Sequence, residues 1–148
     1  MKLILGSDHA GYRLKEYLKK YLDKRKIAYV DVGTYSEEPV DYPVYAAKVA
    51  KKVASGKNMK GILVCGNAEG VCIAANKVKG ARAAVCYDAY TAKTSRQDDN
   101  ANIICLRGRK FSYLKEKNVL KAWLETPFSK KKRHVRRLKE VKQLERNG

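Results

Sequence analysis

The chain has 148 residues, of which 45% are hydrophobic, so it can form one globular domain with its own core. No apolar run is long enough to cross a bilayer, and the apolar start before Ser7 is too short for a signal peptide, so we expect a cytoplasmic protein. The formal charge of +18 at pH 7 predicts an anionic partner, which could be nucleic acid, a membrane surface or a small phosphorylated substrate.

The first predicted elements are two strands, each followed by a helix. Residues 2–6 form a short apolar run typical of a strand, and residues 12–25 have an apolar face opposite lysines and acids, which predicts an amphipathic helix. Residues 27–32 predict the second strand, and residues 43–55 predict a helix with a proline in its first turn. The loop at residues 7–11 carries two polar functional groups, which makes it a candidate part of a site.

The next stretch, residues 61–77 (GILVCGNAEGVCIAANK), combines a strand, a tight loop and a helix. Residues 62–64 predict a buried strand, residues 65–70 a loop, and the stretch from Val71 a helix. Free amide groups and the positive end of the helix dipole would make this loop an anion site. Cys65 stands at its mouth, where a thiolate would be stabilised, although a buried cysteine that merely ends a strand explains the residue equally well.

The last third of the chain continues the alternation. Residues 82–86 and 103–106 predict two further strands, and residues 88–97 and 111–124 predict the helices that follow them. Thr126-Pro127 ends the last of these helices, and residues 130–146 predict a final, basic helix.

Strand and helix alternate five times, which predicts an α/β fold for a single domain, residues 1–148. We expect a Rossmann-like three-layer αβα sandwich with a five-stranded parallel sheet and a basic C-terminal helix. Ligands of such folds bind at the carboxyl ends of the strands, so the loops at residues 7–11, 33–35, 65–70 and 87–88 are expected to converge on one crevice. No G-x-G-x-x-G follows the first strand, which argues against a dinucleotide.

The cysteines and histidines are too scattered for a zinc site or a disulfide framework. There is no C-x-x-C pair, and three of the four cysteines lie in apolar surroundings, which fits reduced and buried thiols. We therefore expect no metal. The four cysteines are Cys65, Cys72, Cys86 and Cys105, and the two histidines are His9 and His134.

Seven short motifs run in order along the chain. They are GSDHAG (6–11), VDYP (40–43), CG (65–66) with IAANK (73–77), GARAA (80–84), SR (95–96), ANI (101–103) and Arg133-His134 with Arg137. Together they resemble the ribose-5-phosphate isomerase B family, which also contains the galactose-6-phosphate isomerase subunits. The similarity extends from residue 1 to about residue 138.

The resemblance implies an aldose–ketose isomerase that works without a cofactor. It would interconvert ribose 5-phosphate and ribulose 5-phosphate through a cis-enediolate, with Cys65 moving the proton between the two sugar carbons. A six-carbon substrate, such as allose 6-phosphate or galactose 6-phosphate, is the alternative within the same class. The family's pattern also implies a homodimer, or a tetramer, whose active site is shared between subunits.

The remaining site residues also follow from the resemblance. Asp8, His9 and Tyr42 would line the sugar site. The resemblance also implies that Arg133 and Arg137 hold the phosphate, and their spacing of four residues would put them on one face of a helix. The other expected substrate contacts are Gly66, Asn67, Ala68, Glu69, Gly70, Asp99 and Arg109.

The most consequential departure from the family's pattern is Asp98, where a histidine usually serves as the acid that opens the furanose ring. An aspartate is a poor proton donor at neutral pH, although Asp98 could still act as a base on the ring hydroxyl. We therefore expect either weak ring opening or a substrate that arrives in open-chain form.

Four further positions depart from the pattern. Ala68 stands where glycine is usual, and a positive φ there would cost about 1 kcal/mol. Glu69 adds a carboxylate beside a site meant for negative oxygens, and we expect it to point outward. Lys131 and Lys132 replace two glycines and add positive charge near the expected phosphate.

A different class of function is a diverged, weakly active homologue whose basic surface binds nucleic acid. The charge favours it. The basic run at residues 130–137 lacks interleaved aromatic residues for base stacking, however, and no nucleic-acid-binding motif appears. The phosphorylated sugar is therefore the expected partner, with neither nucleic acid nor a membrane.

Overall fold

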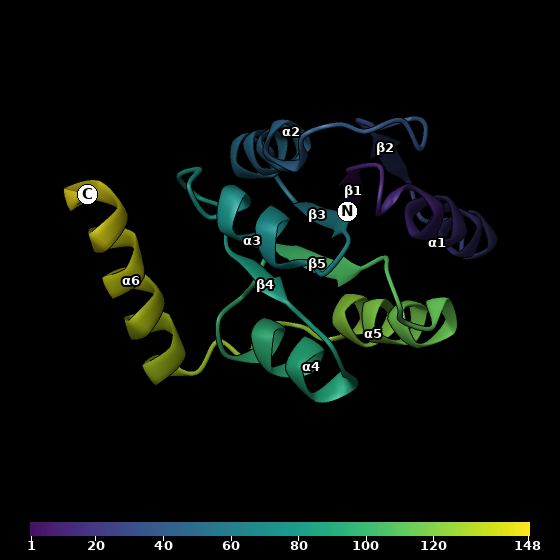
Figure 1. The fold of residues 1–148 in the computed structure, drawn as a ribbon. Helices are drawn as coiled ribbons and strands as arrows, with labels where there is room; N and C mark the ends of the chain where they lie inside the picture. Colours follow the sequence, from purple (N-terminus) through teal and green to yellow (C-terminus); the bar gives the residue numbers. More distant parts are fainter.

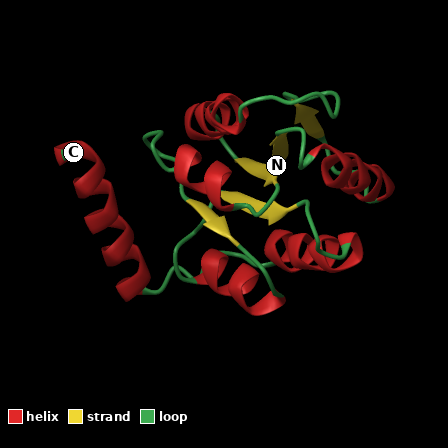
Figure 2. Ribbon diagram, in the orientation of Figure 1, coloured by secondary structure: helices red, strands yellow, loops and turns green.

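The computed structural model describes residues 1–148 and has one five-stranded parallel sheet with helices on both faces (Figures 1 and 2). The order of the strands is β2-β1-β3-β5-β4. The strands are β1 (Lys2–Ser7), β2 (Tyr29–Asp31), β3 (Met59–Cys65), β4 (Ala83–Val85) and β5 (Ile103–Arg107). The helices are α1 (Tyr12–Lys24), α2 (Tyr42–Ser55), α3 (Glu69–Ala75), α4 (Ala89–Gln97), α5 (Tyr113–Glu125) and α6 (Lys132–Asn147).

β3 lies at the centre of the sheet. It has seven residues and pairs in parallel with β1 on one side and β5 on the other. Side chains that alternate along β3 pack on opposite faces, with Ile62 and Val64 in one core and Leu63 and Cys65 in the other. Because helices cover both faces, both sets of side chains are apolar, as in other parallel sheets.

The two cores match two layers of helices. α1, α4 and α5 cover one face of the sheet, where Leu18 and Trp123 are fully buried (Figure 1). α2 and α3 cover the other face, where Val49 and Val71 are fully buried. The predicted three-layer αβα sandwich is therefore confirmed.

A buried lysine ties α1 to the end of β2. Lys15 is 0% exposed, and its Nζ donates to Asp31 Oδ1 at 2.6 Å and to the Thr34 carbonyl at 2.5 Å. Asp31 also accepts from Lys19 at 3.0 Å and from the amide of Gly33 at 2.9 Å. Burial alone would raise the pKa of Asp31, but the hydrogen bonds from Lys15, Gly33 and Lys19 lower it.

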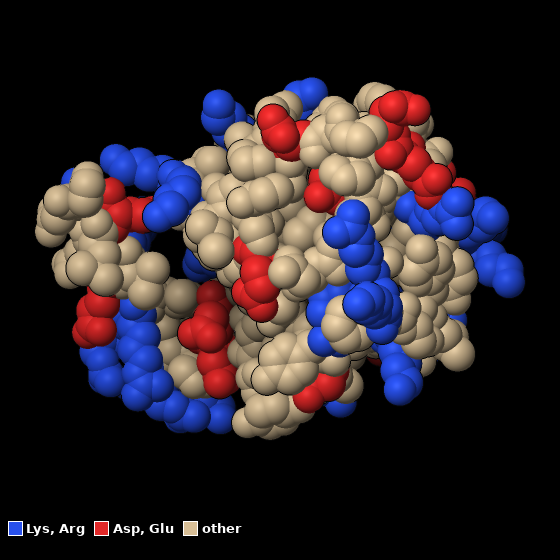
Figure 3. Space-filling view, viewed as in Figure 1, with Lys and Arg blue, Asp and Glu red and all other residues tan.

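α6 stands apart from the three layers (Figures 1 and 2). Of its 16 residues only His134 is buried, while Val141 and Leu144 are exposed. The basic side chains along α6 are visible in Figure 3. None of the six helices is both long and apolar enough to cross a membrane.

The predicted elements are all present, with shifts at their ends. β2 has only three residues, although residues 27–32 were expected to be extended. β3 begins at Met59, before the apolar run that predicted it, because Met59 and Lys60 pair with the start of β1. α3 begins at Glu69 and α6 at Lys132, each within two residues of its predicted start.

Candidate active site

A cavity of about 510 Å³ opens at the carboxyl ends of β1, β3 and β5. The loop after each of these strands lines it, together with the first residue of α2. This is the region in which an α/β sheet usually binds its ligands. Eight of the expected site residues line the cavity: Asp8, His9, Tyr42, Cys65, Gly66, Asn67, Gly70 and Arg109.

The loop after β1 is held by its own hydrogen bonds. Asp8 Oδ1 accepts from the amide of Gly11 at 3.0 Å, and His9 Nδ1 accepts from the amide of Val40 at 3.1 Å. A neutral His9 therefore carries its proton on Nε2 and can donate it to a ligand. Gly11 admits no side chain, because a Cβ there would lie 2.3 Å from the Val64 carbonyl oxygen.

Cys65 lies at the border between the core and the cavity. It ends β3, is 4% exposed and packs in the core under α2 and α3, yet it also lines the cavity. Its Sγ lies 3.9 Å from Asn67 Oδ1, in the loop that follows. Cys65 is therefore both the buried end of a strand and a thiol next to the space where a ligand would bind.

The loop after Cys65 contains two of the positions that depart from the family's pattern. Ala68 is buried and has a φ of 72°, in the left-handed region that favours glycine. Glu69 is exposed and points outward as expected. Neither Ala68 nor Glu69 lines the cavity, although both were among the expected substrate contacts. Gly70 has no room for a side chain, because a Cβ there would lie 2.7 Å from the Tyr42 ring.

Several amide groups of this loop are free to bind an anion. The amide of Glu69 donates to Asn67 Oδ1 at 3.3 Å, whereas the amides of Gly66, Asn67, Ala68 and Gly70 donate to no protein acceptor. A set of amides without acceptors beside a cavity is an arrangement that stabilises a negatively charged oxygen.

The loop after β5 supplies cations. Arg109 is exposed and unpaired, and its amide donates to the Gly66 carbonyl at 3.1 Å. Arg107 donates to the buried Glu116 Oε1 at 3.1 Å, and its guanidinium carbon lies 3.7 Å from the centre of the Phe111 ring. Burial raises the pKa of Glu116, although Arg107 opposes that effect. These contacts fix Arg107, so Arg109 and the exposed Lys110, which both line the cavity, are the cations of this loop left free for a ligand.

Four of the expected site residues lie elsewhere in the chain. Asp98 follows α4 and is half-exposed, with its Oδ1 3.6 Å from His134 Nε2. Asp99 lines a different hollow beside α6, and Arg133 and Arg137 lie on α6 itself. One chain therefore does not bring these residues to the Cys65 cavity.

His134 was missed as a candidate by the sequence reasoning. It is buried, with the Ser129 hydroxyl 2.6 Å from its Nδ1 and Asp98 at its Nε2. The available signal for His134 was its position directly after Arg133, a proposed phosphate ligand. Its burial could not be predicted from the sequence, because the rest of this basic helix is exposed.

Two loops expected at the crevice are absent from it. Residues 33–35 follow β2 and residues 87–88 follow β4, and neither segment lines the cavity. The expectation was wrong for these loops, because β2 and β4 are the edge strands and the crevice lies over the three central strands.

The metal-ligating residues form no cluster. Nowhere do three His, Cys, Asp or Glu side chains gather closely enough to hold a metal ion. All four cysteines are free, and Cys65, Cys86 and Cys105 are buried as expected.

The chain is similar to known sugar-phosphate isomerases in sequence and structure. The family model described as Ribose/Galactose Isomerase matches residues 3–141. The ribose-5-phosphate isomerase B of Escherichia coli is 38% identical over 144 residues, which cover 97% of this chain and 96% of that protein. The structure of ribose-5-phosphate isomerase B from Clostridium thermocellum has a TM-score of 0.95 at 40% identity, and covers 99% of both chains. The Mycoplasma genitalium enzyme with bound ribulose-5-phosphate has a TM-score of 0.94 at 36% identity, over 99% of this chain and 97% of that one.

Proposed function

The chain belongs to the ribose/galactose isomerase family and is an isomerase of the intramolecular oxidoreductase class, and from that premise we propose that it interconverts ribose 5-phosphate and ribulose 5-phosphate. The observation that carries the proposal is the cavity over β1, β3 and β5. It combines a thiol, free amide groups, a carboxylate and an imidazole within one space of about 510 Å³. A pentose phosphate is small enough for such a space.

In the proposed reaction Cys65 acts as the base. Its thiolate removes the proton from C2 of the open-chain aldose, and the electrons of that C–H bond form the double bond of a cis-enediolate. The free amides of the loop at residues 66–70 hold the negative oxygens of this intermediate. The Cys65 thiol then returns the proton to C1, while the hydroxyl proton of O2 passes to O1, so that O2 becomes the carbonyl oxygen of the ketose and O1 its terminal hydroxyl.

Asp8 and His9 are proposed to bind the substrate's oxygens. His9 can donate from Nε2, because its Nδ1 is occupied by the Val40 amide. Asp8 uses Oδ1 to accept from Gly11, so its second oxygen is free to accept from a sugar hydroxyl. Both groups are pre-positioned by backbone hydrogen bonds, which reduces the entropy lost on binding.

We further propose that the site is completed by a second copy of the chain in a homodimer. Within one chain the cavity offers a single free guanidinium, that of Arg109, beside the Lys110 ammonium, and this is a weak phosphate clamp. Arg133 and Arg137 are available on α6, which projects away from its own cavity. The same second copy would bring Asp98 and Asp99 to the sugar.

The test is the interconversion of the two pentose phosphates by the wild type and Cys65→Ala. Because the substitution removes the proposed base, we expect turnover to fall by at least about a thousandfold while folding is retained. The matched control is Cys72→Ala, which removes a half-buried thiol that does not line the cavity. Full activity of Cys65→Ala would contradict the proposed base.

A substrate panel separates the alternatives. Allose 6-phosphate and galactose 6-phosphate should be turned over less efficiently than ribose 5-phosphate if the pentose is the substrate. If no sugar phosphate is turned over and the protein binds DNA with an affinity that falls steeply with salt, the nucleic-acid alternative is favoured instead.

A further inference from the structure

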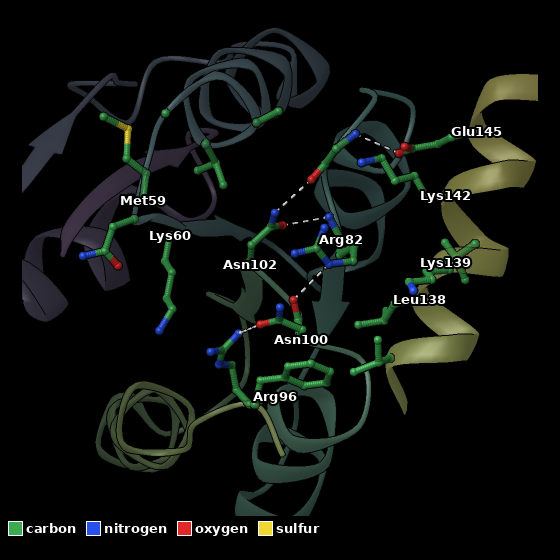
Figure 4. Close-up of a pocket in the computed structure, with 18 residues that line it drawn as sticks. Met59, Lys60, Arg82, Arg96, Asn100, Asn102, Leu138, Lys139, Lys142 and Glu145 are labelled. Atoms are coloured by element: carbon green, nitrogen blue, oxygen red, sulfur yellow. Dashed lines mark hydrogen bonds between the residues drawn. The ribbon is translucent and has the colours of Figure 1, made fainter. Parts of the chain in front are cut away.

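A larger cavity lies at the opposite end of the sheet from Cys65. Its volume is about 720 Å³, and it is enclosed by the beginning of β3, the segments before β4 and β5, and the inner side of α6 (Figure 4). Lys60 lies near the start of β3 and Cys65 ends it, so about 17 Å of strand separates the two cavities. The proposed function assigns no role to this second cavity.

The cavity has far more positive than negative charge. Five cationic side chains line it, and the single acidic one is Glu145, whose Oε1 accepts from the Gly80 amide at 2.8 Å. None of the five cations forms an ion pair. Three of them belong to the body of the protein and two to α6, on opposite walls (Figure 4). They are Lys60, Arg82, Arg96, Lys139 and Lys142.

Some of this charge has a structural role. Arg96 donates to the carbonyls of Thr126 and Ala101 and to Asn100 Oδ1, so it holds the segments around α4 together. Arg82 donates through Nε to the Asn100 carbonyl at 3.0 Å. These bonds occupy most of the Arg96 guanidinium, but they leave both terminal nitrogens of Arg82 without a partner.

Lys60 has no such structural explanation. It is half-buried, and its Nζ has no hydrogen-bond acceptor and no counter-ion, only the face of the Trp123 ring at 5.9 Å. Burial lowers the pKa of Lys60, and the neighbouring Arg96 lowers it further. A partly desolvated ammonium beside the Arg96 guanidinium is unfavourable unless an anion compensates it.

We propose that this cavity binds a small anion with at least two linked phosphate groups, held between Lys60 and Arg82 on the body and Lys139 and Lys142 on α6. The cavity volume lies within the range of small-molecule sites. A linked pair of phosphates fits cations that come from two walls, whereas a single phosphate would satisfy one wall only. The apolar part of the lining, which includes Phe128 and Leu138, could contact an organic portion of the ligand.

The test is calorimetric titration of the full-length protein with inorganic pyrophosphate and, separately, with orthophosphate. Pyrophosphate could also enter the Cys65 cavity, so the titrations are made in a background in which the three proposed phosphate-binding arginines of that cavity, Arg109, Arg133 and Arg137, are changed to Gln. We expect pyrophosphate to bind more tightly than orthophosphate, and Lys60→Gln to weaken pyrophosphate binding at least about tenfold, because it removes a charge-assisted contact. The double variant Lys139→Gln/Lys142→Gln, which removes the charges on the α6 wall, should weaken pyrophosphate binding to a similar extent.

The matched control is Lys57→Gln. Lys57 lies three residues before Lys60, its side chain is exposed, and it does not line the cavity, so the substitution removes the same charge outside the proposed site. It should change the affinity by less than about twofold, because surface charges are screened. If Lys57→Gln and Lys60→Gln weakened pyrophosphate binding equally, the effect would come from the overall positive charge of the protein surface, and the proposal would be overturned. Absence of pyrophosphate binding in this background of three Arg→Gln changes would overturn it as well. Neither result bears on the isomerase activity, which is measured separately.

Discussion

Asp98 offers the most direct test of the acid–base chemistry in the proposed reaction. Its carboxylate is half-exposed and lies 3.6 Å from the His134 imidazole. Ribose 5-phosphate exists mainly as a closed furanose ring, and opening that ring requires a proton on the ring oxygen. An aspartate at this position supplies that proton poorly at neutral pH.

We predict that Asp98→His increases the turnover of ribose 5-phosphate by about tenfold or more, because an imidazole can donate a proton near pH 7. Erythrose 4-phosphate provides an open-chain comparison, because its C4 oxygen carries the phosphate and cannot close a furanose ring. Its turnover should not increase. Asp99→His is the matched control at the adjacent position. An equal gain with both sugars would show that Asp98 acts on a step other than ring opening.

At the scale of single elements, the contact between α1 and β2 depends on the buried pair of Lys15 and Asp31. We predict that Asp31→Asn destabilises the protein by about 3 kcal/mol at pH 7, because it leaves the fully buried Lys15 ammonium without its counter-ion. Urea unfolding measures the difference. Glu37→Gln, which breaks an exposed ion pair with Arg13, should change the unfolding midpoint far less.

The effect of Asp31→Asn should also depend on pH. The pKa of Asp31 is lowered in the folded state, so its contribution to stability is complete above the ordinary carboxyl pKa of about 4. The contribution is lost as the pH falls through the lower, folded-state pKa. The difference in unfolding free energy between the wild type and Asp31→Asn should therefore shrink below about pH 4. A constant difference from pH 7 to pH 3 would contradict the assigned pKa direction.

The elements themselves were largely predictable, because their signals are local. Runs such as Ile62 to Val64, followed by glycines and a helical pattern, specify strand, loop and helix within a few residues. Which loops meet at the crevice depends on strand order instead. The loops after β2 and β4 were expected there because nothing local to them shows that their strands lie at the edges.

Long-range contacts account for what sequence reasoning missed. Lys60 resembles any surface lysine until the fold brings Trp123 and Arg96 beside its side chain, and His134 resembles any residue of a basic helix until Ser129 and Asp98 meet its ring. The positive φ of Ala68 was anticipated only because glycine is usual at that position in the resembled family.

At the scale of the whole molecule, the expected site residues divide into two groups. One group, with Cys65 and Arg109, lines the cavity, and the other, with Arg133 and Arg137, lies on α6. Under the proposed homodimer each site takes one group from each chain. A hybrid dimer that combines Cys65→Ser in one chain with Arg133→Gln and Arg137→Gln in the other then has one fully intact site and one with all the defects.

We predict that co-expressing these two inactive variants restores activity, because a symmetric dimer exchanges equivalent parts between subunits. With random pairing, half of the dimers are hybrids with one intact site of two, so about a quarter of the wild-type activity should return. Two affinity tags, one on each variant, isolate the hybrid, for which about half of the wild-type activity is expected. The matched control pairs Cys65→Ser with Arg109→Gln. Both residues line the same cavity, so every hybrid site carries one defect and no recovery is expected. Recovery in the control, or none in the first pair, would mean that the site is not divided between subunits in this way.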